Sequence, residues 1–136
     1  MNDMIIEIIR PDDWHIHLRE GKILNLVSHF SSRINGRCIV MPNLEIPITD
    51  GKKAKKYKND IIQSFKSNSF IPLIPCYLND NLDFDDFRKS LEDDIFFGAK
   101  LYPVNTTTNS KHGVTNIENI FPALEILQNL NKNLLI

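Results

Sequence analysis

Short apolar runs alternate with helix-like stretches along this chain, and the alternation limits the possible folds more than any other feature. The apolar runs are rich in Ile, Val, Leu and Phe and have the length of buried strands: residues 5–9, 37–41, 70–78, 96–101 and 134–136. Helical periodicity marks the stretches between them: residues 23–32, 49–67, 83–93 and 116–131. Strands that are apolar on both faces and alternate with helices form βαβ units. We therefore predict an α/β fold in which helices cover a parallel sheet.

The second helix-like stretch contains a basic segment, KKAKKYK, at residues 52–58. Such a cluster is found in nucleic-acid-binding patches and in nuclear-import signals. Here Tyr57 and Ile61 belong to an apolar stripe at helical spacing, so the lysines are expected on the opposite, solvated face. We interpret the segment as one face of an ordinary helix, capped at its start by Thr49 or Asp50.

Charge and hydropathy exclude several classes of partner. The 136 residues carry a formal net charge of −1, which lacks the positive excess of proteins that bind nucleic acid or anionic membranes. No apolar run approaches the roughly 20 residues that a membrane-spanning helix needs, and the N-terminus lacks the features of a signal peptide. A cytoplasmic location and a small-molecule or protein partner are expected. Cys38 and Cys76 lie in apolar segments and are predicted to be buried thiols.

Residues 12–20 read DDWHIHLRE and place two histidines one residue apart. Side chains alternate along a strand, so His15, His17 and Arg19 would project from the same side, near the carboxyl end of a strand formed by residues 5–9. Two imidazoles on one side are a metal-ligand pattern. The alternative is a pair of histidines that only make hydrogen bonds at a strand end.

Two further polar residues are expected at the same edge of the sheet. Asn43 follows the second strand in VMPN, and Lys100 lies in the fourth apolar run, FFGAKLYP. Binding groups gather at the carboxyl ends of parallel strands. Burial lowers the pKa of a lysine, and its neutral amine can react with carbon dioxide to give a carbamate that bridges two cations. The alternatives are a turn asparagine and a lysine whose amine reaches solvent.

Taken together, these motifs resemble the N-terminal part of the dihydroorotases, the zinc amidohydrolases of pyrimidine synthesis, in their shorter bacterial form. HIHLRE, IVMPN, GAKLYP and the loop NTTTNSKHGVT occur in the family's order, with RPDDWH and CYL in place, so the resemblance spans nearly the whole chain. It implies two zinc ions in each complete subunit, held by His15, His17 and an N6-carboxylated, bridging Lys100. It also implies substrate contacts from Arg19, Asn43, Tyr102, Thr107 and Thr108, the last two on a lid loop.

The resemblance also implies a (β/α)₈ TIM barrel, which typically needs about 250 residues. We therefore expect residues 1–136 to be a single incomplete barrel domain: four βα units and the start of strand five. In the family the remaining metal-binding histidines and the proton-transfer aspartate lie beyond that point. The chain alone is then expected to have no catalytic residue and no activity, and the complete enzyme to be a homodimer. Inward-facing residues are expected to meet water or another chain, namely Ile8, Ile39, Ile74 and Phe97.

The implied reaction is the reversible hydrolysis of dihydroorotate to N-carbamoyl-aspartate. Other cyclic-amide hydrolases, of the hydantoinase or allantoinase type, share this chemistry. The pair of Arg19 and Asn43 favours dihydroorotate, because a guanidinium and an amide suit a substrate with a carboxylate. A non-catalytic remnant that binds a partner is the alternative from a different class.

Overall fold

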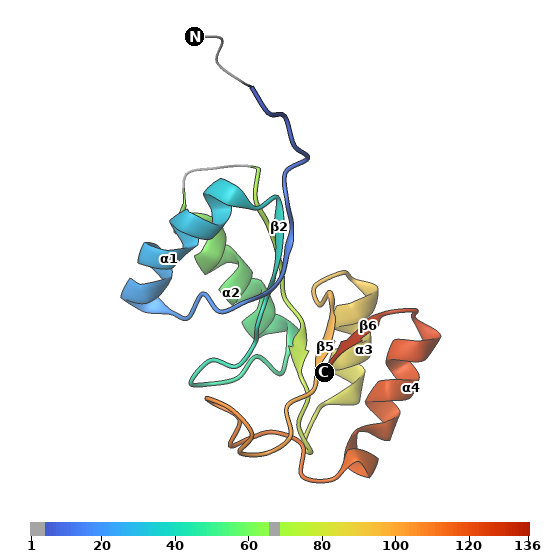
Figure 1. Ribbon diagram of the computed structural model, residues 1–136. Coiled ribbons are helices and arrows are strands. Elements are labelled where there is room, and N and C mark those ends of the chain that lie inside the picture. The colour runs from blue at the N-terminus through green and yellow to red at the C-terminus, as the bar shows by residue number, and fades with distance from the viewer. Residues whose placement is uncertain (1–4, 66–68) are drawn as a thin grey trace.

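The computed structural model describes residues 5–65 and 69–136. Strands and helices alternate as the sequence predicts (Figure 1). In chain order the elements are β1 (Asp13–Ile16), α1 (Gly21–Ile34), β2 (Arg37–Val40), α2 (Gly51–Gln63), β3 (Ile71–Leu73), β4 (Cys76–Tyr77), α3 (Phe84–Glu92), β5 (Gly98–Lys100), the 3-10 helix η1 (Ile117–Ile120), α4 (Phe121–Asn129) and β6 (Asn133–Leu135).

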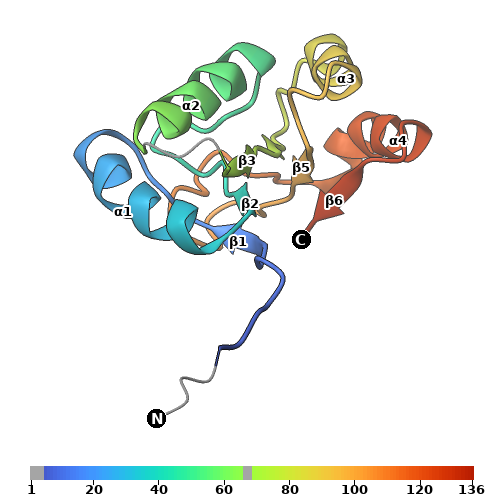
Figure 2. The ribbon, with the colours of Figure 1, turned by 90° about the horizontal axis from the view of Figure 1, so that it is seen from above.

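The strands form two three-stranded sheets, in the orders β1-β2-β3 and β4-β5-β6, and each neighbouring pair is parallel. Seen from above, the strands follow an open arc and the four α-helices lie along its outer side (Figure 2). The predicted α/β class with a parallel sheet is confirmed. Because neighbouring strands are parallel, the carboxyl ends of the strands in each sheet lie at the same edge.

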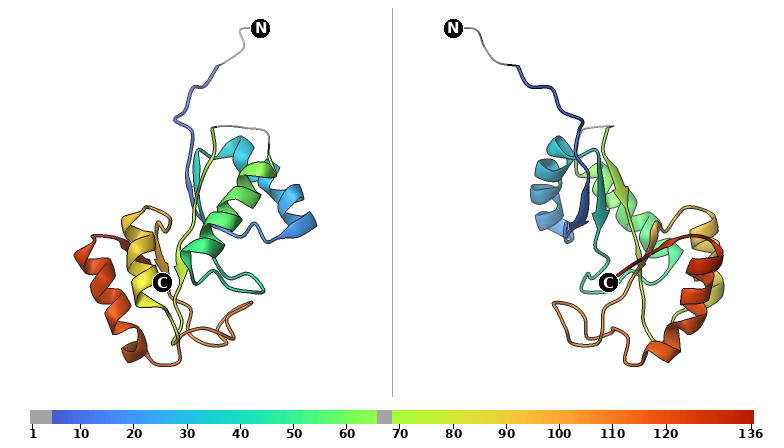
Figure 3. Two further views of the ribbon diagram at one scale, coloured as in Figure 1. Left: turned by 180° about the vertical axis from the view of Figure 1, so that it is seen from behind. Right: turned by 45° about the vertical axis from the view of Figure 1, so that its right-hand side comes forward.

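The prediction of a first strand at residues 5–9 is wrong. This segment has no regular structure, and Ile5, Ile6, Ile8 and Ile9 are between 75% and 95% exposed. It extends away from the body of the molecule (Figure 3). The physical reason is the lack of a partner: β2 begins only at Arg37, so pairing with β1 starts at Asp13 opposite Cys38. The first strand therefore contains His15 instead of preceding it.

The third predicted strand, residues 70–78, is divided into β3 and β4. The break lies at residues 74–75, where Pro75 supplies no backbone N–H to a ladder. Residues on one side of the break pair with β2, and those on the other side pair with β5. The N–H of Phe97 donates to the carbonyl of Ile74 at 2.9 Å. This short junction is the direct link between the two sheets.

The predicted helices are present, with shifted ends. α1 extends beyond residues 23–32 at both ends, and the 3-10 turn η1 precedes α4. Asp50 caps α2, since its side chain accepts a hydrogen bond from the N–H of Lys53 at 2.8 Å. The predicted end of this helix at residue 67 falls outside the described residues. No helix among the described residues is long and apolar enough to cross a membrane.

The main hydrophobic core lies between the sheets and the helices. Both cysteines belong to it and are fully buried free thiols, as predicted, and burial raises the pKa of Cys38 to about 11. Ile39 and Ile74 were expected to be uncovered and to meet water or another chain, but within this chain they are only 3% and 1% exposed. Ile39 lies on β2, the central strand of its sheet, and Ile74 belongs to the core cluster.

Candidate functional site

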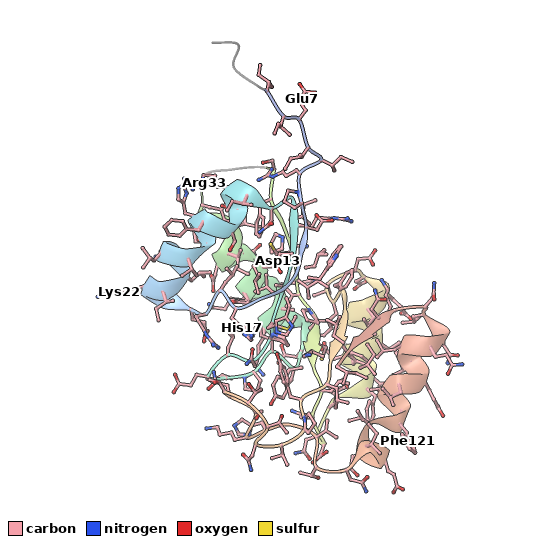
Figure 4. The ribbon with its side chains drawn as sticks, in the orientation of Figure 1. Glu7, Asp13, His17, Lys22, Arg33 and Phe121 are labelled. Carbon is pink, nitrogen blue, oxygen red and sulfur yellow. The ribbon has the colours of Figure 1, made fainter. Side chains whose placement is uncertain are left out.

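The predicted site residues gather at the carboxyl ends of the strands. His15 is the third residue of β1 and His17 directly follows that strand, while Lys100 is the last residue of β5. Asn43 lies in the loop after β2. In Figure 4 the His17 side chain lies toward the loops that follow β2 and β5, whereas Glu7 points away from the body of the molecule. The parallel arrangement thus brings three separate segments to one edge.

The two histidines form a close pair. Their ring centroids are 5.3 Å apart with an interplanar angle of 59°, and the backbone N–H of His15 donates to the Asp13 carboxylate at 3.0 Å. Burial lowers the pKa of His17, and the charges of Arg19, His15 and Lys100 add to this effect, while the Asn43 side chain opposes it. A lowered pKa favours the neutral imidazole, which is the form that binds metals.

Lys100 is nearly buried without a counter-ion. The residue is 6% exposed, its side chain makes no hydrogen bond or ion pair with the described residues, and Nζ lies 5.2 Å from the centroid of the Tyr102 ring. Burial lowers the pKa of its amine. A larger neutral fraction of the amine is the condition for carbamate formation, so the environment of Lys100 suits the predicted modification.

Arg19 occupies a backbone conformation that is uncommon for a residue other than glycine. Its φ is 60°, in the left-handed region. The hydroxyl of Tyr57, which lies on α2 and is buried, donates to the Arg19 carbonyl at 2.9 Å. The guanidinium forms no ion pair among the described residues and is available to an anionic ligand.

The loop of residues 103–113 folds back over Asn43. The side-chain amide of Asn43 donates to the carbonyl of Thr108 at 2.9 Å, and the side-chain amide of Asn109 donates to the carbonyl of Asn43 at 3.0 Å. This loop and the loop after β2 lie side by side in both Figure 1 and Figure 3. Thr107 and Thr108 are exposed on it, so their hydroxyls are accessible.

Two buried polar atoms at this edge have no hydrogen-bond partner among the described residues. They are Oδ1 of Asn43 and the hydroxyl of Tyr102. Tyr102 is stacked on Tyr77, with ring centroids 5.2 Å apart. Buried polar atoms are rarely left unpaired, so this acceptor and this donor are candidates for hydrogen bonds to a further polar group.

The structure therefore places the predicted residues at the carboxyl ends of the strands, but its described residues form no complete metal centre. Among the described residues, no group of three or more His, Cys, Asp and Glu side chains is placed to hold a metal ion. Three residues that support the site were missed: Tyr57, Tyr77 and Asn109. Tyr57 lies in an apolar stripe of the sequence, and a buried tyrosine usually finds a hydrogen-bond partner for its hydroxyl. This signal could have predicted that Tyr57 bonds another segment. Asn109 lies in a loop rich in asparagine, a residue that tolerates left-handed backbone.

The chain is similar to dihydroorotases in both sequence and structure. No protein-family model matches it. It is 47% identical over 133 residues to the dihydroorotase of Salmonella arizonae and 46% identical over 133 residues to that of Salmonella paratyphi B, covering 97% of this chain in each case. The crystal structure of Campylobacter jejuni dihydroorotase matches 92% of this chain with a TM-score of 0.83 and 35% identity.

A second solved structure agrees with the first. Dihydroorotase from Saccharomyces cerevisiae, in complex with 5-fluoroorotic acid, matches 91% of this chain with a TM-score of 0.82 and 29% identity. The chain spans 38% of the length of the Salmonella relatives and 37% and 34% of the two crystallised chains. The predicted resemblance is thus confirmed, and the chain is related over nearly its entire length to part of a dihydroorotase.

Proposed function

We propose that this chain supplies part of the zinc and substrate site of a dihydroorotase, which in complete form interconverts dihydroorotate and N-carbamoyl-aspartate. The observation that carries the proposal is the gathering, at the carboxyl ends of the strands, of a histidine pair, a buried asparagine and a buried lysine that has no counter-ion among the described residues. These residues come from three strands, in a chain 47% identical to a dihydroorotase.

His15, His17 and Lys100 are the proposed zinc ligands, with Lys100 carboxylated and bridging two ions. The donor set fits: imidazoles and a carboxylate are ordinary zinc ligands, and the environment of His17 favours its neutral form. Zinc supplies Lewis acidity, which polarises an amide carbonyl and lowers the pKa of water. The protein's part is to hold the imidazoles on one side of β1 and to keep the lysine amine away from solvent.

We assign substrate binding to the residues around the proposed zinc ligands. The Arg19 guanidinium offers two parallel N–H groups to a carboxylate, and the Asn43 amide has a second N–H beyond the one that it gives to Thr108. Thr107, Thr108 and Tyr102 are the other proposed contacts. The ligand of the yeast relative, 5-fluoroorotic acid, belongs to the same class of cyclic acids and supports this assignment.

The proposed fold is the N-terminal half of a TIM barrel, with residues 1–136 as one incomplete domain. Closing such a barrel takes eight βα units, and the remaining units would supply further ligands and the proton-transfer aspartate. We place the complete protein in the cytoplasm, as a homodimer. On this proposal the chain by itself contains no catalytic residue and does not turn over dihydroorotate.

A chimera tests the proposal. The 133 matched residues of this chain replace their counterpart in the Salmonella arizonae enzyme, and the interconversion of dihydroorotate and N-carbamoyl-aspartate is assayed. We expect activity in the chimera and a loss of at least about 100-fold on Lys100→Ala, as for residues that support metal binding. His29→Ala is the control, because His29 lies on the exposed side of α1. A chimera with full activity after Lys100→Ala would contradict the proposal.

Zinc binding gives a readout that does not depend on turnover. Zinc bound per molecule of the 136-residue chain is measured after equilibrium dialysis, with His17→Ala compared with His29→Ala. The first substitution should reduce the bound zinc and the second should not. Equal zinc contents in the two variants would contradict zinc binding by the histidine pair.

A further inference from the structure

The loop of residues 103–113 is tied to the body of the protein through one of its own residues, Asn109. The Asn109 side chain donates to the backbone carbonyl of Asn43 at 3.0 Å. The Asn109 carbonyl in turn accepts a hydrogen bond from the hydroxyl of Tyr77 at 3.3 Å. One loop residue thus contacts the segments that follow β2 and end β4.

The contact between the two loops is reciprocal. The Asn43 side chain donates to the backbone of Thr108, and the Asn109 side chain donates to the backbone of Asn43. Asn43 is only 1% exposed, so both bonds are largely shielded from water. Each bond fixes one loop against the other, and together they determine where Thr108 lies relative to Asn43.

Further hydrogen bonds join residues 107 and 110 within the loop. Ser110 is buried, its hydroxyl donates to the carbonyl of Thr107 at 2.6 Å, and the N–H of Thr107 donates back to that hydroxyl at 2.9 Å. These bonds make residues 107–110 a compact turn. A compact turn moves as a unit, so the anchor at Asn109 also positions Thr107 and Thr108.

We propose that Asn109 is a positioning residue: it latches residues 103–113 onto Asn43 and Tyr77 and thereby holds Thr107 and Thr108 over the site. The latch rests on these contacts alone. Its effect on the reaction rests on the proposed function, in which Asn43 and the two threonines bind substrate.

The loop contains a matched control for this residue. Asn105 and Asn109 both have left-handed backbones, with φ of 60° and 56°. The Asn105 side chain makes no hydrogen bond to the described residues, whereas the Asn109 side chain forms the latch. Glycine adopts such a backbone without strain, so Asn→Gly at either position keeps the loop geometry accessible. Only Asn109→Gly removes a bond of the latch, the one from the side chain to the Asn43 carbonyl.

Limited proteolysis measures the latch directly in the 136-residue chain. Lys111 is exposed within the loop, and its trypsin cleavage reports how often the loop leaves the body of the protein. Loss of one hydrogen bond predicts cleavage about fivefold faster in Asn109→Gly than in Asn105→Gly.

Tyr77→Phe removes the other anchor and should also accelerate cleavage. Thermal unfolding midpoints separate loop release from global unfolding. Equal cleavage rates in the two glycine variants would overturn the latch.

Kinetics of the chimera test the effect on substrate binding. If only the latched loop binds substrate well, loosening it reduces the competent fraction and raises KM by about the same factor, with kcat nearly unchanged. Asn109→Gly should therefore raise KM about fivefold relative to Asn105→Gly. An unmodified chimera that is inactive would contradict the proposed function. An active chimera with equal KM in the two variants would instead exclude the positioning role.

Discussion

At the scale of single residues, two tyrosine hydroxyls near the site have opposite environments. Tyr57 donates to the Arg19 carbonyl at 2.9 Å, whereas the Tyr102 hydroxyl is buried and has no partner among the described residues. The same chemical group thus stabilises the backbone at one position and is left unpaired at the other. The Tyr57 contact matters for the site, because it holds the left-handed backbone of Arg19.

Replacing each tyrosine by phenylalanine tests this difference. Tyr57→Phe should lower the free energy of unfolding by about 1 kcal/mol, because the Arg19 carbonyl loses its partner. Tyr102→Phe, the matched control, should leave stability unchanged or slightly higher, since an unpaired buried hydroxyl is removed. Urea denaturation of both variants gives the comparison. A larger loss at Tyr102 than at Tyr57 would contradict these contacts.

The sequence could predict where the candidate residues lie, but not which residues support them. The positions of His15, His17 and Lys100 follow from strand alternation and from the rule that binding groups gather at the carboxyl ends of parallel strands. The roles of Tyr57 and Asn109 depend on hydrogen bonds to residues 38 and 66 positions away. No local pattern encodes such partners, because they arise only when the elements pack.

At the scale of elements, strand pairing overrides local propensity. The β-branched run at residues 5–9 is a strong strand pattern, yet it remains unpaired because β2 starts too late to reach it. The run at residues 70–78 also has strand propensity, but it breaks at Pro75 into β3 and β4. Apolar periodicity could therefore predict how many βα units exist, but not where each strand acquires a neighbour.

The approach of β5 to β6 depends on a glycine. A Cβ at Gly98 would lie 2.4 Å from the backbone oxygen of Asn133, so the two strands would have to separate. We expect Gly98→Ala to lower the free energy of unfolding by about 1–3 kcal/mol, the usual cost of overpacking. Gly36→Ala is the control, because its added Cβ would meet its nearest atom at an ordinary 3.5 Å. Denaturation curves that rank Gly36→Ala as the more damaging change would show that β5 and β6 are not this close.

At the scale of the whole molecule, aspartates link segments that are distant in the sequence. Asp12 contacts Arg37, Asp80 contacts Thr115, and Asp94 contacts Lys132. These hydrogen bonds lower the pKa of each carboxyl group. A lowered folded-state pKa means that the carboxylate stabilises the fold at neutral pH and that this contribution disappears in acid.

The stability of the chain should therefore fall with acidification only below about pH 4, where the unfolded aspartates begin to take up protons. As the pH drops further through the lowered folded-state pKa values, the contribution is lost. Asp80→Asn should reduce this dependence, because one of the linked carboxylates no longer titrates. Urea denaturation between pH 2 and pH 7 measures the pH dependence of the free energy of unfolding. Identical pH profiles for the two proteins would show that the bond between Asp80 and Thr115 does not stabilise the fold.

The exposed N-terminal isoleucines predict that the chain associates in solution. Ile6 and Ile8 lie on a segment that packs on nothing among the described residues. Contiguous exposed apolar side chains promote association. Light scattering after size-exclusion chromatography should detect species larger than a monomer, and Ile6→Lys with Ile8→Lys should shift them toward the monomer. A monomer at all concentrations would contradict this.

The junction at residues 74–75 makes the geometry of the site sensitive to bending. His15, His17 and Asn43 belong to the sheet of β1, β2 and β3, whereas Lys100 is on β5 in the other sheet. A small rotation about this pivot would change the separation of the lysine from the imidazoles while leaving the hydrogen bonds within each sheet intact. A partner that spans β1 and β6 would act as a brace and would hold Lys100 at a fixed distance from the two imidazoles.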